Sequence, residues 1–168
     1  MEARAKMMGH PVHQMLIVFP LGLLGMSVVF DFVYMGSDDM VFSVVAYWMM
    51  VAGIAGGLLA APFGLIDWSA IPTGTRAKRV GAMHGMGNVV VLLLFIVSVL
   101  LRDGAEAPPP ASAYLCSFAG VALSLVTAWL GGELVDRLGV GVHDDANLDA
   151  PSSLGHTHAR ADHAPHVR

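Results

Sequence analysis

The chain has 168 residues, of which 55% are hydrophobic and 13% charged, with a formal net charge of −4 at pH 7. Its mean hydropathy is +0.65. Soluble domains carry about 25% charged residues, so this composition excludes a soluble globular protein. The hydrocarbon core of a bilayer is about 30 Å thick and needs roughly 20 apolar residues of α-helix to cross it. We therefore looked for uncharged stretches of that length.

Four such stretches lie between charged residues. They predict helices over approximately residues 11–35, 40–66, 80–101 and 111–134. We therefore expect an all-α membrane protein in which residues 1–142 form one domain, an up-and-down bundle of four transmembrane helices. A secretory signal peptide is the competing interpretation of the first stretch, because Arg4 and Lys6 precede it. No small-residue cleavage site follows that stretch, which favours a retained helix.

Basic residues are concentrated on one side of the predicted bundle. That side holds Arg4, Lys6, Arg76, Lys78, Arg79 and Arg137. The opposite side has Arg102 near a helix end, together with Asp38, Asp39, Asp103 and Glu106. Loops rich in Lys and Arg stay in the cytoplasm, so we expect both termini there. Residues 143–168 are rich in Gly, Asp, Pro, Ser and His, which predicts a flexible, His-rich cytoplasmic tail.

Small residues recur every four positions in the second predicted helix. They form two stripes, Gly53, Gly57 and Ala61, and Gly56, Ala60 and Gly64. Such stripes let helix backbones approach closely in lipid. We expect them to pack against another helix of the chain or to form the contact of a homo-oligomer. No internal repeat is strong enough to define a duplicated unit, although the four helices can form two hairpins.

Ionisable side chains from all four helices are expected at the basic side. His13 lies in the first turn of the first helix, and His84 enters the third helix from the same side. Asp67 and Glu133 end the second and fourth helices there. On the opposite side, Asp31 is the comparable ionisable residue. It lies on the same stripe of the first helix as His13, because eighteen residues make five helical turns. Histidines at membrane depth are costly unless they are paired, hydrated or bound to a ligand. The simplest alternative is that each imidazole is hydrated among the lipid headgroups.

The first functional hypothesis is a b-type haem site. Two neutral imidazoles from different helices are suitable axial ligands of a haem iron, and Arg side chains suit its propionates. We therefore predict that His13 and His84 are the axial ligands, with Asn88 one turn after His84. The residues expected near the propionates are Arg76, Arg79 and Arg137. This hypothesis describes an electron carrier rather than a stand-alone enzyme, whose partner is a redox protein or a quinone.

Two other hypotheses use the same region differently. The set His10, His13, Asp67, His84 and Glu133 offers ligands for a divalent metal ion, or proton-relay groups. Such a site would serve a small transporter or a metal-dependent enzyme. The third hypothesis is a non-catalytic membrane scaffold in which the polar groups only support helix packing. We find no nucleic-acid-binding motif.

Four short motifs carry a resemblance to a known family. They are Gly9-His-Pro-Val-His-Gln-Met-Leu-Ile-Val-Phe-Pro20, Gly64-Leu-Ile-Asp-Trp68, His84-Gly-Met-Gly-Asn88 and Gly131-Gly-Glu-Leu-Val135. In this order they resemble the membrane-protein family called domain of unknown function 2231, over residues 9–142. The first motif of that family usually reads His-Pro-x-His-Pro-Met-Leu. Here Gln14 replaces the second proline, and Val18 stands where many members have a further histidine or a proline.

The resemblance implies a four-helix integral membrane domain of bacteria, and hence the cytoplasmic (inner) membrane. Some members of the family are joined to an iron–sulfur domain of Rieske type, which favours redox work. This chain has a single cysteine, Cys116, and no iron–sulfur motif. A redox partner is therefore expected to be a separate protein or a quinone. The motifs contain the same ionisable residues that the depth argument selects.

Overall fold

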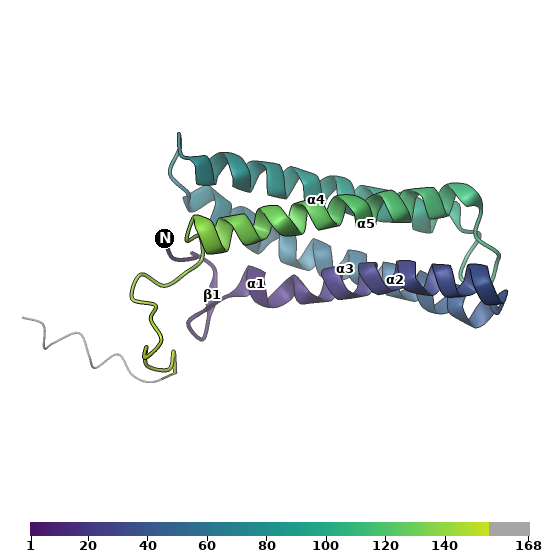
Figure 1. Cartoon of the computed structure of the whole chain (residues 1–168), viewed down its shortest axis with the longest axis horizontal. Helices are drawn as coiled ribbons and strands as arrows, with labels where there is room; N and C mark the ends of the chain where they lie inside the picture. The colour runs from purple at the N-terminus through teal and green to yellow at the C-terminus, as the bar shows by residue number, and fades with distance from the viewer. Residues whose placement is uncertain (155–168) are drawn as a thin grey trace, which may run out of the picture.

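The computed structural model describes residues 1–154 of the chain, in which four helices are long and apolar enough to cross a membrane. These spans are Val12–Ser37, Met40–Ala70, Arg76–Leu101 and Ala111–Arg137. They lie side by side and alternate in direction, so the predicted all-α bundle is confirmed (Figure 1). The N-terminus and the chain that leaves the last helix lie at one end, which we call the terminal end (Figure 1). Residues 155–168, which belong to the predicted His-rich tail, lie outside the described residues.

The elements follow one another with short connections. They are β1 (Lys6–Met7), β2 (His10–Pro11), α1 (Val12–Leu16), α2 (Val18–Ser37), α3 (Met40–Ala70), α4 (Arg76–Leu101), α5 (Ala111–Gly132) and the π-helical turn η1 (Glu133–Arg137). β1 and β2 pair antiparallel at the terminal end. α1 and α2 are one span interrupted at Ile17, because Pro20 has no N–H to donate to the carbonyl one turn earlier.

Local side-chain contacts set where the later helices begin. The Asp39 side chain accepts a hydrogen bond from Val41 N at 3.1 Å, which caps α3. Thr75 Oγ1 accepts from Lys78 N at 3.1 Å and caps α4. These short polar side chains satisfy N–H groups that the first helical turn leaves without partners.

The helices extend beyond the ends expected from the charged residues. α3 continues past Asp67 to Ala70, and α4 begins at Arg76 rather than near residue 80. Charge limits how deeply a residue sits in lipid, but it does not end a helix. Trp68 and Lys78 join these two helix ends: Trp68 Nε1 donates to Lys78 O at 3.1 Å, and Lys78 Nζ donates to Trp68 O at 2.8 Å. Long basic side chains can therefore reach polar partners while their stems cover apolar surface.

The small-residue stripes of α3 pack inside the chain. A Cβ at Gly53 would lie 2.6 Å from Leu24 Cδ2 of α2, and one at Gly57 would lie 2.7 Å from Leu92 Cδ2 of α4. Gly56 faces Phe19 and the ring of Pro20 in the same way. Of the two roles expected for the stripes, packing within the chain is therefore the one this structure uses.

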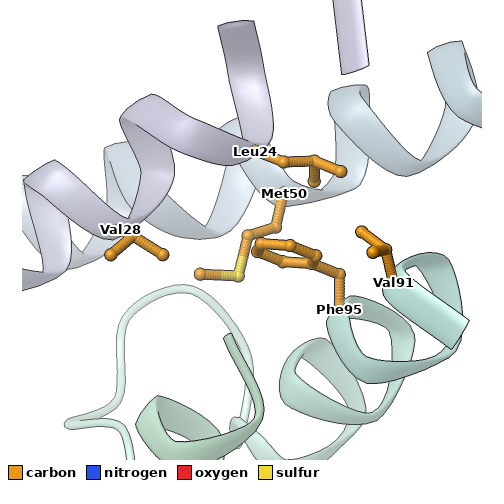
Figure 2. Packing of buried hydrophobic residues seen from close by; sticks show 5 residues of the cluster. All are labelled: Leu24, Val28, Met50, Val91 and Phe95. Carbon is orange, nitrogen blue, oxygen red and sulfur yellow. The ribbon is translucent and has the colours of Figure 1, made fainter. Parts of the chain in front are cut away.

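The centre of the bundle is a cluster of buried apolar side chains from three helices. They are Leu24, Val28, Met50, Val91 and Phe95. Figure 2 shows Met50 and the Phe95 ring side by side, with Val28 and Val91 flanking them. On the outer surface, large apolar side chains such as Leu58, Leu100 and Leu115 are exposed. A bundle that is apolar on the outside as well as the inside is suited to lipid.

The second hairpin repeats the first, and the expectation that no meaningful repeat exists was wrong. Asp31 and Arg102 are 71 positions apart, and the same separation relates His13 to His84 and Leu24 to Phe95. In the second helix of each hairpin, matched positions are 67 apart, and Gly120 packs on Phe95 as Gly53 packs on Leu24. Further matched pairs are fully or almost fully buried in both hairpins: Ser27 and Ser98, Ala46 and Ala113, Met50 and Ser117, and Ala60 and Thr127. The repeat consists of matched burial and close contacts, and some of the matched residues are identical, such as His13 and His84, Ser27 and Ser98, and Gly53 and Gly120.

Candidate functional site

His13 is held against α3 by its ring and by one ring nitrogen. Its Nδ1 lies 3.0 Å from the carbonyl oxygen of Ala60. The ring packs on Gly64, where a Cβ would lie 2.8 Å from His13 Cε1. A carbonyl oxygen only accepts hydrogen bonds, so Nδ1 is the nitrogen that carries the proton. Nε2 is therefore the nitrogen with the free lone pair.

His84 is held against α5 by the matching set of contacts. Its Nδ1 lies 2.9 Å from the carbonyl oxygen of Thr127. A Cβ at Gly131 would lie 3.2 Å from His84 Cε1. The same reasoning assigns the proton to Nδ1 and the lone pair to Nε2. Both imidazoles are thus fixed in the tautomer in which Nε2 can bind a metal ion.

The two imidazoles lie close together near the terminal end of the bundle. Their ring centroids are 6.4 Å apart, and the ring planes are nearly perpendicular at 87°. Two imidazoles that bind one metal ion through Nε2, with bonds of about 2.0–2.1 Å, have ring centroids about 6 Å apart. The donor atoms and the spacing of His13 and His84 are therefore those that two imidazoles holding one metal ion would need.

Asn88 is the third polar side chain of this site. Its Nδ2 donates to His84 O at 2.9 Å and lies 3.2 Å from His84 Nε2. Thr127 Oγ1 donates to Asn88 Oδ1 at 3.0 Å. Asn88 lies beside His84, as its position one turn later predicts. The roles of Ala60 and Thr127 were not predicted, because each contributes a main-chain oxygen, which leaves no signature in the sequence.

The three glycines around His84 differ in how closely they are packed. A Cβ at Gly81 would meet Trp68 Cδ1 at 2.7 Å, and one at Gly87 would meet Thr127 Cγ2 at 2.5 Å. Both glycines therefore serve helix packing. Gly85 has no heavy atom within 4 Å of the corresponding position, so space remains on that side of α4.

The other residues of the metal hypothesis have different partners. Asp67 Oδ1 accepts hydrogen bonds from the main-chain N–H groups of Arg4 and Ala5, at 2.7 and 3.0 Å. Glu133 forms an ion pair of 2.6 Å with Arg76, and His10 Nε2 lies 3.0 Å from Ser153 Oγ. Within residues 1–154, no three or more His, Cys, Asp or Glu side chains converge as a metal-ion site. Of the five predicted ligands, the structure brings together His13 and His84.

The three arginines expected near haem propionates all lie at the terminal end. Arg76 and Arg79 are exposed in the first turn of α4, and Arg137 is exposed in η1. Arg137 lines an open hollow of about 200 Å³ together with Trp129 and Glu133. The guanidinium of Arg76 is already paired with Glu133. These residues supply positive charge at this end of the bundle.

A second polar cluster lies at the opposite end of the bundle. Arg102 donates from both terminal nitrogens to Asp31, at 3.0 and 2.7 Å, and the side chains are 1% and 0% exposed. Ser117 Oγ lies 3.5 Å from Asp31 Oδ2, and the guanidinium lies over the Tyr114 ring at 5.6 Å. Arg102 was expected near a helix end on the side opposite the basic residues, and its pairing with Asp31 was not predicted. Its spacing of five turns from His84 was the signal that it faces inward.

These features define a multi-pass integral membrane protein with one polar cluster at each end. The chain belongs to the family of predicted membrane proteins DUF2231, whose model matches residues 9–144. The family resemblance inferred from the four motifs is thereby confirmed. No curated protein and no solved structure matches the chain.

Proposed function

We propose that this protein is a b-type haem electron carrier of the membrane, in which His13 and His84 would hold the iron. The observation that supports this is the pair of imidazoles 6.4 Å apart, each with Nδ1 directed at a main-chain carbonyl. Histidine ligands of metals usually donate their second ring nitrogen in this way, which fixes the ring and raises its basicity. A hydrated headgroup histidine needs no such anchoring.

Different residues of the chain would have different roles at such a site. His13 and His84 would hold the iron, and the carbonyls of Ala60 and Thr127 would keep both rings in the coordinating tautomer. When bound, haem supplies reversible one-electron chemistry. Arg79 and Arg137 are exposed at the same end and offer positive charge to propionates. A redox protein or a quinone would exchange electrons there, so the chain acts as a carrier rather than a stand-alone enzyme.

The basic residues at the terminal end support a cytoplasmic location for this site. The expected cytoplasmic basic residues lie at that end, and the positive-inside rule then assigns the haem site to the cytoplasmic side of the bacterial inner membrane. The metal-ion alternative has weaker support, because Asp67 and Glu133 are engaged with Arg4, Ala5 and Arg76.

The test is a visible spectrum of the full chain, purified in detergent after expression with a haem supply. We expect a Soret band and sharp α and β bands after reduction by dithionite. The sharp bands should be lost in His13→Ala and in His84→Ala. His10→Ala is the matched control, because His10 contacts Ser153 instead, and it should keep them. A colourless wild-type protein would reject the proposal. Elemental analysis would then separate a metal protein from a scaffold.

A further inference from the structure

The repeat between the two hairpins is broken beside one of the two imidazoles. Asn88 lies one helical turn after His84, and its matched position in the first hairpin is Ile17, one turn after His13. Asn88 Nδ2 lies 3.2 Å from His84 Nε2. An isoleucine side chain has no hydrogen-bond donor. The two imidazoles therefore differ at the nitrogen that would bind iron.

Asn88 is held in the orientation that brings its amide to His84. One contact is the hydrogen bond from Asn88 Nδ2 to His84 O, at 2.9 Å. The other is the bond that Thr127 Oγ1 donates to Asn88 Oδ1, at 3.0 Å. Thr127 also supplies the carbonyl that holds His84 Nδ1. The amide has two N–H groups, so it can donate to His84 O and to His84 Nε2 together.

We propose that Asn88 makes His84 an exchangeable ligand, whereas His13 is the permanent one. This inference rests on the proposed haem site. The single lone pair of His84 Nε2 cannot bind a metal ion while it accepts a hydrogen bond, so Asn88 competes with the iron for it. If His84 withdrew, His13 alone would hold the iron, and a small neutral diatomic ligand would take the place of His84. The Asn88 amide, which lies 3.2 Å from His84 Nε2, would offer that ligand a hydrogen bond, a feature that governs diatomic binding in haem pockets.

The experiment is a titration of the dithionite-reduced full chain with carbon monoxide, followed by the shift of the Soret band. We expect wild-type protein to bind carbon monoxide. Asn88→Leu removes the competing donor, so it should bind carbon monoxide about tenfold more weakly at equal haem content, the change that loss of one hydrogen bond of about 1.4 kcal/mol produces. Val90→Leu, on the exposed side of α4, is the matched control and should titrate like wild type.

A second measurement keeps the inference testable if Asn88→Leu does not fold. His84→Ala should retain more haem than His13→Ala, because His13 alone then holds the iron. Equal haem loss in these two variants would overturn the inference, and so would a wild-type Soret band that does not respond to carbon monoxide. A wild-type protein without any Soret band rejects the proposed function itself, and this is visible before carbon monoxide is added.

Discussion

Asp31 and Arg102 occupy matched positions of the two hairpins. Their side chains form a bidentate ion pair between α2 and the end of α4. Each lies five helical turns after a histidine of the other cluster, Asp31 after His13 and Arg102 after His84. One register therefore places the imidazoles at one end of the bundle and the ion pair at the other. The apolar cluster around Met50 and Phe95 lies between them.

The ion pair leads to the first prediction. Asp31→Asn leaves the buried guanidinium of Arg102 without its counter-charge, and breaking a buried pair in this way costs about 3–5 kcal/mol. The double variant Asp31→Leu/Arg102→Met should recover most of that loss, because neither charge is then buried. The measurement is the free energy of unfolding in detergent, from denaturant titrations followed by circular dichroism. Asp103→Asn makes the same chemical change at an exposed neighbouring residue and should have little effect. Equal stability of the two Asn variants would refute the prediction.

The second prediction concerns the glycine beneath His13. Gly64→Ala introduces a Cβ 2.8 Å from His13 Cε1, so the ring must move away from the carbonyl of Ala60. We expect this variant to lose most of the sharp reduced bands while the helices remain intact by circular dichroism. Gly22→Ala is the control, because no heavy atom lies within 4 Å of its new Cβ. Full retention of the bands in Gly64→Ala would show that the ring position does not depend on this contact.

The third prediction tests the repeat itself. Gly53→Ala places a Cβ 2.6 Å from Leu24 Cδ2, and Gly120→Ala places one 2.8 Å from Phe95 Cε2. Overpacking of this kind costs about 1–3 kcal/mol, and we expect similar losses of unfolding free energy in both variants. Adding Leu24→Ala should offset part of the loss caused by Gly53→Ala but not that caused by Gly120→Ala. Rescue of both variants would mean that these contacts are not separate.

The fourth prediction is a pH dependence at the terminal end. The Lys6 side chain donates a hydrogen bond to Glu2 and lowers the pKa of that carboxyl, with a further contribution from nearby His143. Because the folded pKa is the lower one, the contact stabilises this end above the ordinary pKa of about 4.3. That contribution is lost as the pH falls through the folded value.

A spin label can report this change. Placed at Asp144→Cys in a Cys116→Ser background, it should become more mobile as the pH falls from about 6 to about 3, through the titration range of carboxyl groups. Glu2→Gln should weaken that pH dependence, because the titrating carboxyl is absent. An unchanged response in Glu2→Gln would assign the transition to another carboxyl group, such as Asp145.

The sequence predicted the parts of this structure that depend on hydropathy and helical period. Apolar stretches gave the four spans, and their polar ends placed His13 and His84 at one depth. The partners of Asp67 and Glu133 were not predictable, because they are distant in the sequence. They are the main-chain N–H groups of Arg4 and Ala5 for Asp67, and Arg76 at the start of α4 for Glu133. The site itself depends on main-chain oxygens and glycine contacts. Those follow from how the hairpins pack, which one-dimensional patterns do not contain.

The matched hairpins also bear on how such a chain can arise. Two identical hairpins assembled as a symmetric dimer would have the same residue at both positions that Asp31 and Arg102 occupy, so two like charges would meet there. The pair of Asp31 with Arg102 therefore requires two hairpins whose sequences can differ. The two hairpins must be encoded by separate stretches of one gene or by two genes. The same holds for Asn88 opposite Ile17. Duplication of one hairpin followed by fusion of the two copies would thus place the two imidazoles at equivalent positions. It would also let the residues around each imidazole change separately.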